Sequence, residues 1–114
     1  MKETEWRNQA QQDGYDEVIT IDWGSGLFND THTHDFRVNL FIVSGGMMVT
    51  IGDEEIACGV GYNLTFDAGL PHSELVGPDG VSFLLARKTG LYQTARRETH
   101  VWPFQGTINL NQSW

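Results

Sequence analysis

Cysteine and long hydrophobic runs are almost missing from this chain of 114 residues. Cys58 is its only cysteine, which excludes an internal disulfide and a framework of paired thiols. The longest apolar run, residues 40–43, has the length of a strand and falls far short of the ~20 residues that a membrane-spanning helix needs. The N-terminal residues contain no apolar segment typical of a signal peptide. The sequence therefore predicts a cytoplasmic protein that makes no membrane contact.

Basic residues are also few, with 7 Lys and Arg against 15 Asp and Glu and a net charge of −8. Nucleic acids and anionic membrane surfaces bind proteins through basic patches, so this charge argues against both partners. Hydrophobic residues reach 39%, which is enough for the core of one domain over residues 1–114.

Glycine, with 13 residues, divides the chain into short runs rich in β-branched and aromatic side chains. Such runs at regular spacing predict an all-β fold, a sandwich or a barrel. We expect strands at residues 17–23, 27–34, 36–44, 47–51, 55–58, 62–66, 72–76, 81–88 and 101–110. Gly45-Gly46 is typical of a two-residue hairpin turn, and residues 77–80 of a second turn. Residues 1–15 are polar, and we interpret them as an N-terminal arm, extended or a frayed helical turn, with Trp6 as a docking point.

Histidine carries the strongest functional signal. His32 and His34 lie two residues apart, so on a strand both imidazoles leave the same face, about 6.6 Å apart at their Cα atoms. Two such rings can bind one metal ion, and His72, which follows a glycine–proline turn, is the candidate for a third ligand. Such a pair is a weak motif by itself, because most histidines are surface or hydrogen-bonded residues.

The spacing of glycines around these histidines resembles the two motifs of the cupin superfamily. The first motif corresponds to Gly26, His32, His34, Asn39 and Gly46, and the second to Gly61, Asp67, Gly69 and His72. The resemblance implies a cupin-type jelly-roll β-barrel with motif one at 26–46, motif two at 61–76, and a metal ion held by the three histidines. Three positions depart from the family pattern. Asn39 replaces the usual glutamate ligand, Asp67 a proline and Val76 an asparagine.

A three-histidine site with Asn39 as a neutral or absent fourth ligand resembles the cupins that use iron to add oxygen to thiols or diketones. The resemblance therefore implies a metal-dependent enzyme, dioxygenase- or isomerase-like, acting on a small organic molecule. The alternatives are a non-catalytic sensor-type domain that binds a metal or small ligand, and a barrel that has lost its metal. Imidazole ligands suit Fe, Mn, Ni and Zn, so the sequence does not choose among them.

Other side chains have two interpretations each. Glu74 follows His72 by two residues, so it is either a fourth ligand or general base, or an exposed strand-end residue. Tyr62 is a candidate catalytic residue that lines the cavity, or a core residue. Arg87 faces an anionic substrate if the alternating residues of its strand point inward, and is solvated otherwise. Apolar terminal strands that pair across a two-fold axis predict a homodimer.

Overall fold

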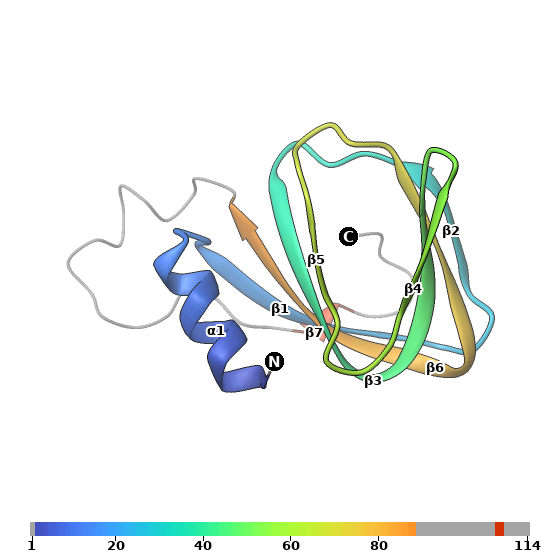
Figure 1. The fold of residues 1–114 in the computed structure, drawn as a ribbon, viewed down its shortest axis with the longest axis horizontal. Coiled ribbons are helices and arrows are strands. Elements are labelled where there is room, and N and C mark those ends of the chain that lie inside the picture. The colour runs from blue at the N-terminus through green and yellow to red at the C-terminus, as the bar shows by residue number, and fades with distance from the viewer. Residues whose placement is uncertain (1, 89–106, 109–114) are drawn as a thin grey trace.

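The computed structural model describes residues 2–88 and 107–108, and Figure 1 shows a β-barrel with one helix beside it. The elements are α1 (Glu3–Gln12), β1 (Glu17–Trp23), β2 (Phe28–His32), β3 (Arg37–Ile51), β4 (Glu54–Cys58), β5 (Asn63–Phe66), β6 (His72–Lys88) and β7 (Thr107–Ile108). The all-β prediction is confirmed. Among the described residues, no helix has both the length and the apolar character that crossing a membrane requires.

Two long strands, β3 and β6, build the barrel by pairing antiparallel along their whole length, from Arg37 opposite Lys88 to Thr50 opposite Ser73. The first half of β3 pairs with β5 and its second half with β4. Likewise, β6 pairs first with β2 and then with β1. The sheet thus folds over into two layers, which is the jelly-roll architecture that the sequence predicts (Figure 1).

The bend in these strands depends on glycine. Gly45 has φ +69°, and a Cβ built there would lie 2.0 Å from the carbonyl oxygen of Gly80. No other residue type fits where two backbones approach so closely. The predicted hairpin at Gly45-Gly46 and the predicted turn at residues 77–80 are therefore wrong, because both segments are bends within continuous strands. Gly45-Gly46 does mark a change of direction in the chain. The two halves of β3 do not pair with each other, however, but with β4, β5 and β6.

The N-terminal residues form a regular helix, α1, rather than an extended arm. Trp6 and Ala10 lie four residues apart on the face of α1 that packs on the barrel, and both are buried. The Trp6 ring stacks on Phe41 of β3 at 5.7 Å between centroids. Trp6 is therefore the docking point that the sequence predicts, and one aromatic side chain anchors an otherwise polar helix.

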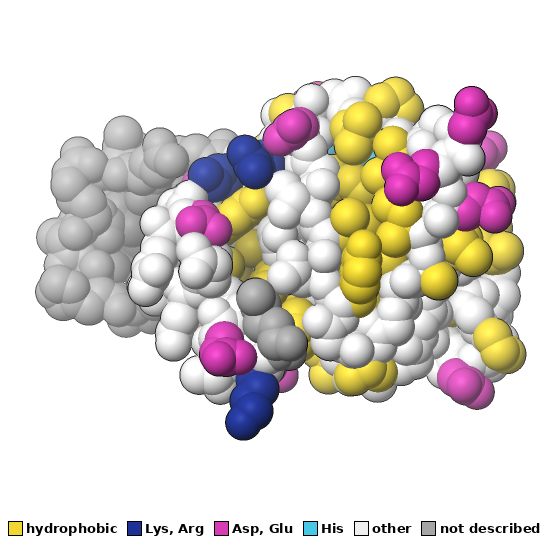
Figure 2. Space-filling view, viewed as in Figure 1, with side chains coloured by type: hydrophobic (Ala, Val, Ile, Leu, Met, Phe, Trp, Pro, Cys, Tyr) yellow, Lys and Arg dark blue, Asp and Glu magenta, His cyan; other side chains and the backbone are white. Residues whose placement is uncertain are grey.

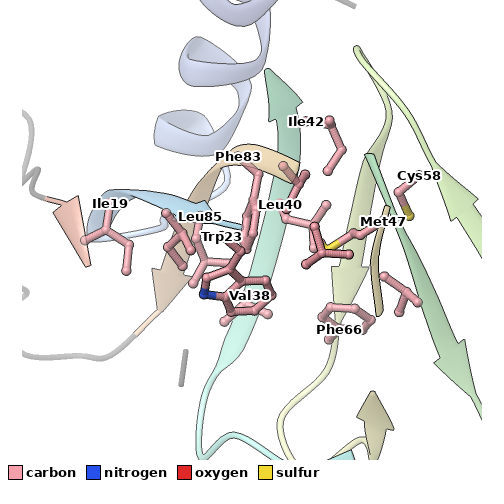
Figure 3. Packing of buried hydrophobic residues seen from close by; sticks show 14 residues of the cluster. Ile19, Trp23, Val38, Leu40, Ile42, Met47, Cys58, Phe66, Phe83 and Leu85 are labelled. Carbon is pink, nitrogen blue, oxygen red and sulfur yellow. The ribbon is translucent and has the colours of Figure 1, made fainter. Parts of the chain in front are cut away.

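The main core lies inside the barrel and takes alternate residues of β1, β3 and β6. Trp23 and Phe83 pack there edge to face at 5.2 Å (Figure 3). Cys58 is buried in the same core, and burial, together with the nearby charge of Glu74, raises the pKa of its thiol to about 11. The thiol is thus protonated at neutral pH and is not a nucleophile.

The barrel is open on one side. Within the described residues, β4 and β5 each pair with β3 and not with one another. Figure 2 shows a band of hydrophobic side chains down this face, while acidic side chains are scattered around it. β7 pairs parallel with β1 at Thr20 and Ile21. The rest of the predicted strand at 101–110, and His100, lie outside the described residues.

Candidate metal centre

The three predicted histidines meet at one end of the barrel. His32 ends β2, His34 follows it, and His72 begins β6 directly opposite His32 in the strand register. One ring nitrogen from each lies within 4.8 Å of the others. The pairing of β2 with β6 therefore brings the two motifs together.

The ring positions fit a single ion. The ring centres are 4.4 Å apart for His32 and His72, 4.9 Å for His32 and His34, and 5.1 Å for His34 and His72. An imidazole bound through one nitrogen at about 2.1 Å has its ring centre about 3.2 Å from the ion. The three distances then correspond to angles of about 90–105° at a common ion, between the octahedral and tetrahedral values.

Backbone carbonyls set the proton positions of two rings. Nδ1 of His32 lies 2.6 Å from the carbonyl oxygen of Asp30, and Nδ1 of His72 lies 3.0 Å from that of Leu70. A carbonyl oxygen only accepts, so each Nδ1 donates a hydrogen bond, and Nε2 is the ring nitrogen that faces Glu74. Phe66 stacks on the His72 ring at 4.1 Å and 7°, which fixes its plane. The rings are thus oriented as metal-binding histidines usually are.

Glu74 completes the cluster. Its side chain is fully buried, with Oε2 3.1 Å from Nε2 of His72 and Oε1 3.6 Å from Nε2 of His32. Asn29 donates a hydrogen bond of 3.0 Å to Oε1 and holds the carboxylate in place. The carboxyl group of Glu74 therefore lies beside the ring nitrogens of two of the three histidines. The interpretation of Glu74 as an exposed strand-end residue is wrong.

Burial keeps His34 neutral. Desolvation is the main cause that lowers its pKa to about 4, and the charges of His72, His32 and Arg87 lower it further. The imidazole is therefore unprotonated at pH 7 and can bind an ion. Because the unfolded chain takes up this proton near the ordinary pKa of about 6.5, acidification from there to pH 4 destabilises the metal-free fold.

Asn39 lies apart from the histidines, in contrast to the expectation from the first motif. Its neighbours Val38 and Leu40 are completely buried inside the barrel, so Asn39 faces outward toward α1. There its side chain accepts a hydrogen bond from Nε1 of Trp6 and donates one to Oγ1 of Thr65. The spacing of motif one is kept, but the alternation of β3 points the side chain of residue 39 away from the histidines. The carboxylate beside the histidines is that of Glu74, from motif two.

Replacing Asn39 by glutamate tests this placement. We expect unchanged affinity for divalent ions, because residue 39 does not reach the cluster. We expect a loss of about 1–3 kcal/mol in the free energy of unfolding, because the bonds to Trp6 and Thr65 are disrupted. Calorimetric zinc titration and urea denaturation measure the two effects. Tighter zinc binding by the variant would instead place residue 39 beside the ion.

Two other features lie away from the histidines. Tyr62 is in the turn before β5 and is 40% exposed, so its role as a catalytic residue stays a prediction. A largely apolar pocket of about 530 Å³ lies beside the bends of β3 and β6, and Gly26, Gly46, Met47, Cys58, Val76 and Pro78 are among the residues that line it. Gly26 precedes β2 whereas His32 ends it, so the pocket and the histidine cluster occupy different ends of this strand.

Comparison with known proteins identifies the fold. No protein-family model matches the chain, and no curated protein matches it in sequence. Among solved structures, it is similar to a cupin superfamily protein from Desulfitobacterium hafniense, with a TM-score of 0.54, 16% identity, and 59% of this chain and 61% of that one covered. The chain has the cupin fold. It matches cupin relatives over less than two thirds of their length.

Two further cupins with assigned names resemble the chain. Oxalate decarboxylase from Bacillus subtilis, described with Mn(II) centres, gives a TM-score of 0.57 and 28% identity over 63% of this chain and 20% of that one. A DMSP lyase from Ruegeria pomeroyi gives a TM-score of 0.59 and 22% identity over 67% of this chain and 39% of that one. The predicted resemblance to the cupin superfamily is confirmed at the level of the fold, and one of the enzymes with this fold contains manganese.

Proposed function

We propose that the chain is a metal-binding cupin in which His32, His34 and His72 hold one divalent transition-metal ion, and that it acts on a small organic molecule. The observation that carries this proposal is the convergence of one ring nitrogen from each histidine within 4.8 Å, beside the buried carboxylate of Glu74. Three nitrogens and one oxygen form a donor set that suits Fe, Mn, Ni or Zn.

When bound, the ion acts as a Lewis acid that polarises a coordinated oxygen or sulfur of the substrate. Glu74 then has one of two roles, as a fourth ligand or as a base that accepts a proton from the bound molecule. Asn29 fixes Oε1, whereas Oε2 lies next to His72. In the ligand role, Glu74 replaces the carboxylate that cupins usually supply at the position of Asn39.

A sensor-type cupin without catalysis is the second candidate. The pocket of about 530 Å³ supports it, because it offers an apolar ligand a place away from the histidines.

We also propose that the chain forms a homodimer, which sedimentation equilibrium would detect at twice the mass of 12.8 kDa.

The decisive experiment is elemental analysis of protein purified without a histidine tag and without chelator. We expect close to one equivalent of a transition metal, and loss of this metal in His32→Ala. Thermal denaturation with added Fe²⁺, Mn²⁺, Ni²⁺ or Zn²⁺ is the second measurement, because an ion that binds only the folded state raises its melting temperature. Absence of metal together with no thermal shift would contradict the proposal.

Replacing Glu74 by glutamine tests the role of the carboxylate. We expect zinc affinity to fall by about 10- to 100-fold, since loss of a contact to the ion or its ligands has an effect of this size. Competition with a chromogenic chelator measures the affinity. Glu55→Gln is the matched control, because Glu55 is an exposed glutamate on β4. Equal affinities in both variants would exclude Glu74 from the site.

A further inference from the structure

Arg87 enters the same end of the barrel as the histidines. It shares a face of β6 with Phe83 and Leu85, which are completely buried in the core. Its strand partner in β3 is Val38, which is also fully buried. Arg87 is therefore the basic residue that ends the inward-facing row of β6. Of the two interpretations that the sequence allowed, inward-facing or solvated, the structure supports the first.

A short chain of ring contacts connects Arg87 to the metal centre. Its guanidinium carbon lies 5.4 Å from the ring centre of Phe36, and that ring stacks on His34 at 6.0 Å and 22°. Arg87 therefore lies beside the histidine cluster, separated from His34 by the ring of Phe36.

The guanidinium has hydrogen-bonding capacity left. Nη2 of Arg87 contacts Oε1 of Glu17, and the side chains are 20% and 10% exposed. Nε is buried and has no hydrogen-bond partner within the part of the chain that the structure describes. A guanidinium carries five N–H donors, so the ion pair with Glu17 alone does not use them all, and among the described residues donors are left for another acceptor.

Neighbouring cations do not share this placement. Arg37 is half exposed and lies 3.7 Å from Asp67, and the ammonium of Lys88 lies 5.0 Å above the ring of Tyr15. An overall charge of −8 disfavours anions on most of the surface. Arg87 is thus the described cation that faces the interior beside the histidines.

We propose that Arg87 is a specificity-determining residue that binds the carboxylate of a small anionic substrate, whose other polar end reaches the metal ion. This inference rests on the proposed metal function. Arginine suits the role, because its planar fork binds a carboxylate through two parallel hydrogen bonds. Phe36, between Arg87 and His34, offers an apolar wall for the carbon chain that joins the two ends.

The test uses zinc-loaded protein and two ligands, glutarate and its monoamide glutaramate. In glutaramate, a neutral amide replaces one of the two carboxylates. We expect glutarate to bind more tightly than glutaramate in calorimetric titration. In Arg87→Met, we expect glutarate affinity to fall at least about tenfold, the effect of losing a charge-assisted pair, and the preference over glutaramate to disappear. Arg37→Met is the control, and we expect it to keep both the glutarate affinity and the preference over glutaramate. Zinc content is measured in every sample.

Glu17 separates a binding role from a merely structural ion pair. Glu17→Gln frees a donor of Arg87 for the ligand, so we expect glutarate to bind as tightly as in the unmodified chain or more tightly. The double variant Glu17→Gln with Arg87→Met avoids a buried unpaired charge and loses glutarate binding while it stays folded. Zinc binding with equal glutarate affinity in this double variant and the unmodified chain would overturn this inference alone. Absence of zinc would overturn the metal function as well.

Discussion

Replacing His72 by alanine is expected to abolish tight metal binding and the thermal stabilisation that the metal provides. His72 is 1% exposed, begins β6 and contributes the nitrogen closest to Glu74. Its loss leaves two histidines from one short segment, and we expect zinc affinity to fall by at least about 100-fold, beyond the effect of changing a residue that only supports a ligand. Chelator competition measures the affinity, and melting curves with and without zinc measure the stabilisation.

The metal-dependent shift is the quantity to compare, because His72→Ala also removes the ring that stacks on Phe66. That lost contact lowers the stability of the metal-free protein whether or not the site binds an ion. Ser73→Ala is the control, since Ser73 is the next residue on β6 and points to the other face. An unchanged zinc content and an unchanged shift in His72→Ala would remove His72 from the site.

Replacing Gly45 by valine is expected to prevent folding or to destabilise the protein by more than about 4 kcal/mol. A Cβ at this position lies 2.0 Å from a backbone oxygen of Gly80, and backbone atoms cannot rotate away as a side chain does. Positive φ adds a second cost for a β-branched residue. Soluble yield and circular dichroism with urea denaturation measure the outcome.

Gly52→Ala is the matched control for the bend. Gly52 has φ +60° but nothing within 4 Å of a built Cβ. It therefore isolates the cost of the left-handed backbone, about 1–2 kcal/mol. If Gly45→Val were as stable as Gly52→Ala, the close approach of β3 and β6 at this bend would be contradicted.

The sequence predicted the strands well where local pattern determines them. Residues 17–23 alternate in the chain and form β1 with the same bounds. Its failures concern information that is not local. Gly45-Gly46 marks a bend in either a hairpin or a long strand, and only the partner strand decides between them. Helix α1 was predicted only as an extended arm or a frayed helical turn, because its polar composition gives little periodicity and only Trp6 and Ala10 are buried on it.

The site shows the same division. His32 and His34 are recognisable from their spacing, and the glycine pattern locates His72. The position of the carboxylate was harder to predict, because it depends on which residues of β3 face inward. Asn39 occupies the family's carboxylate position but bonds to Trp6, while Glu74 lies on the inner face of β6. A one-residue change of register reverses such an assignment, and the sequence of a single chain does not reveal it.

The full-length pairing of β3 with β6 also has a kinetic consequence. Arg37 pairs with Lys88 and Thr50 with Ser73, so most of the barrel's pairing joins residues far apart in the chain. Folds dominated by such distant contacts form slowly, in about milliseconds to seconds. His32 and His34 lie two residues apart in the chain, whereas the pairing of β2 with β6 brings His72 to them. Capture of a metal ion would therefore report the formation of this pairing, and stopped-flow refolding with a zinc indicator would time it.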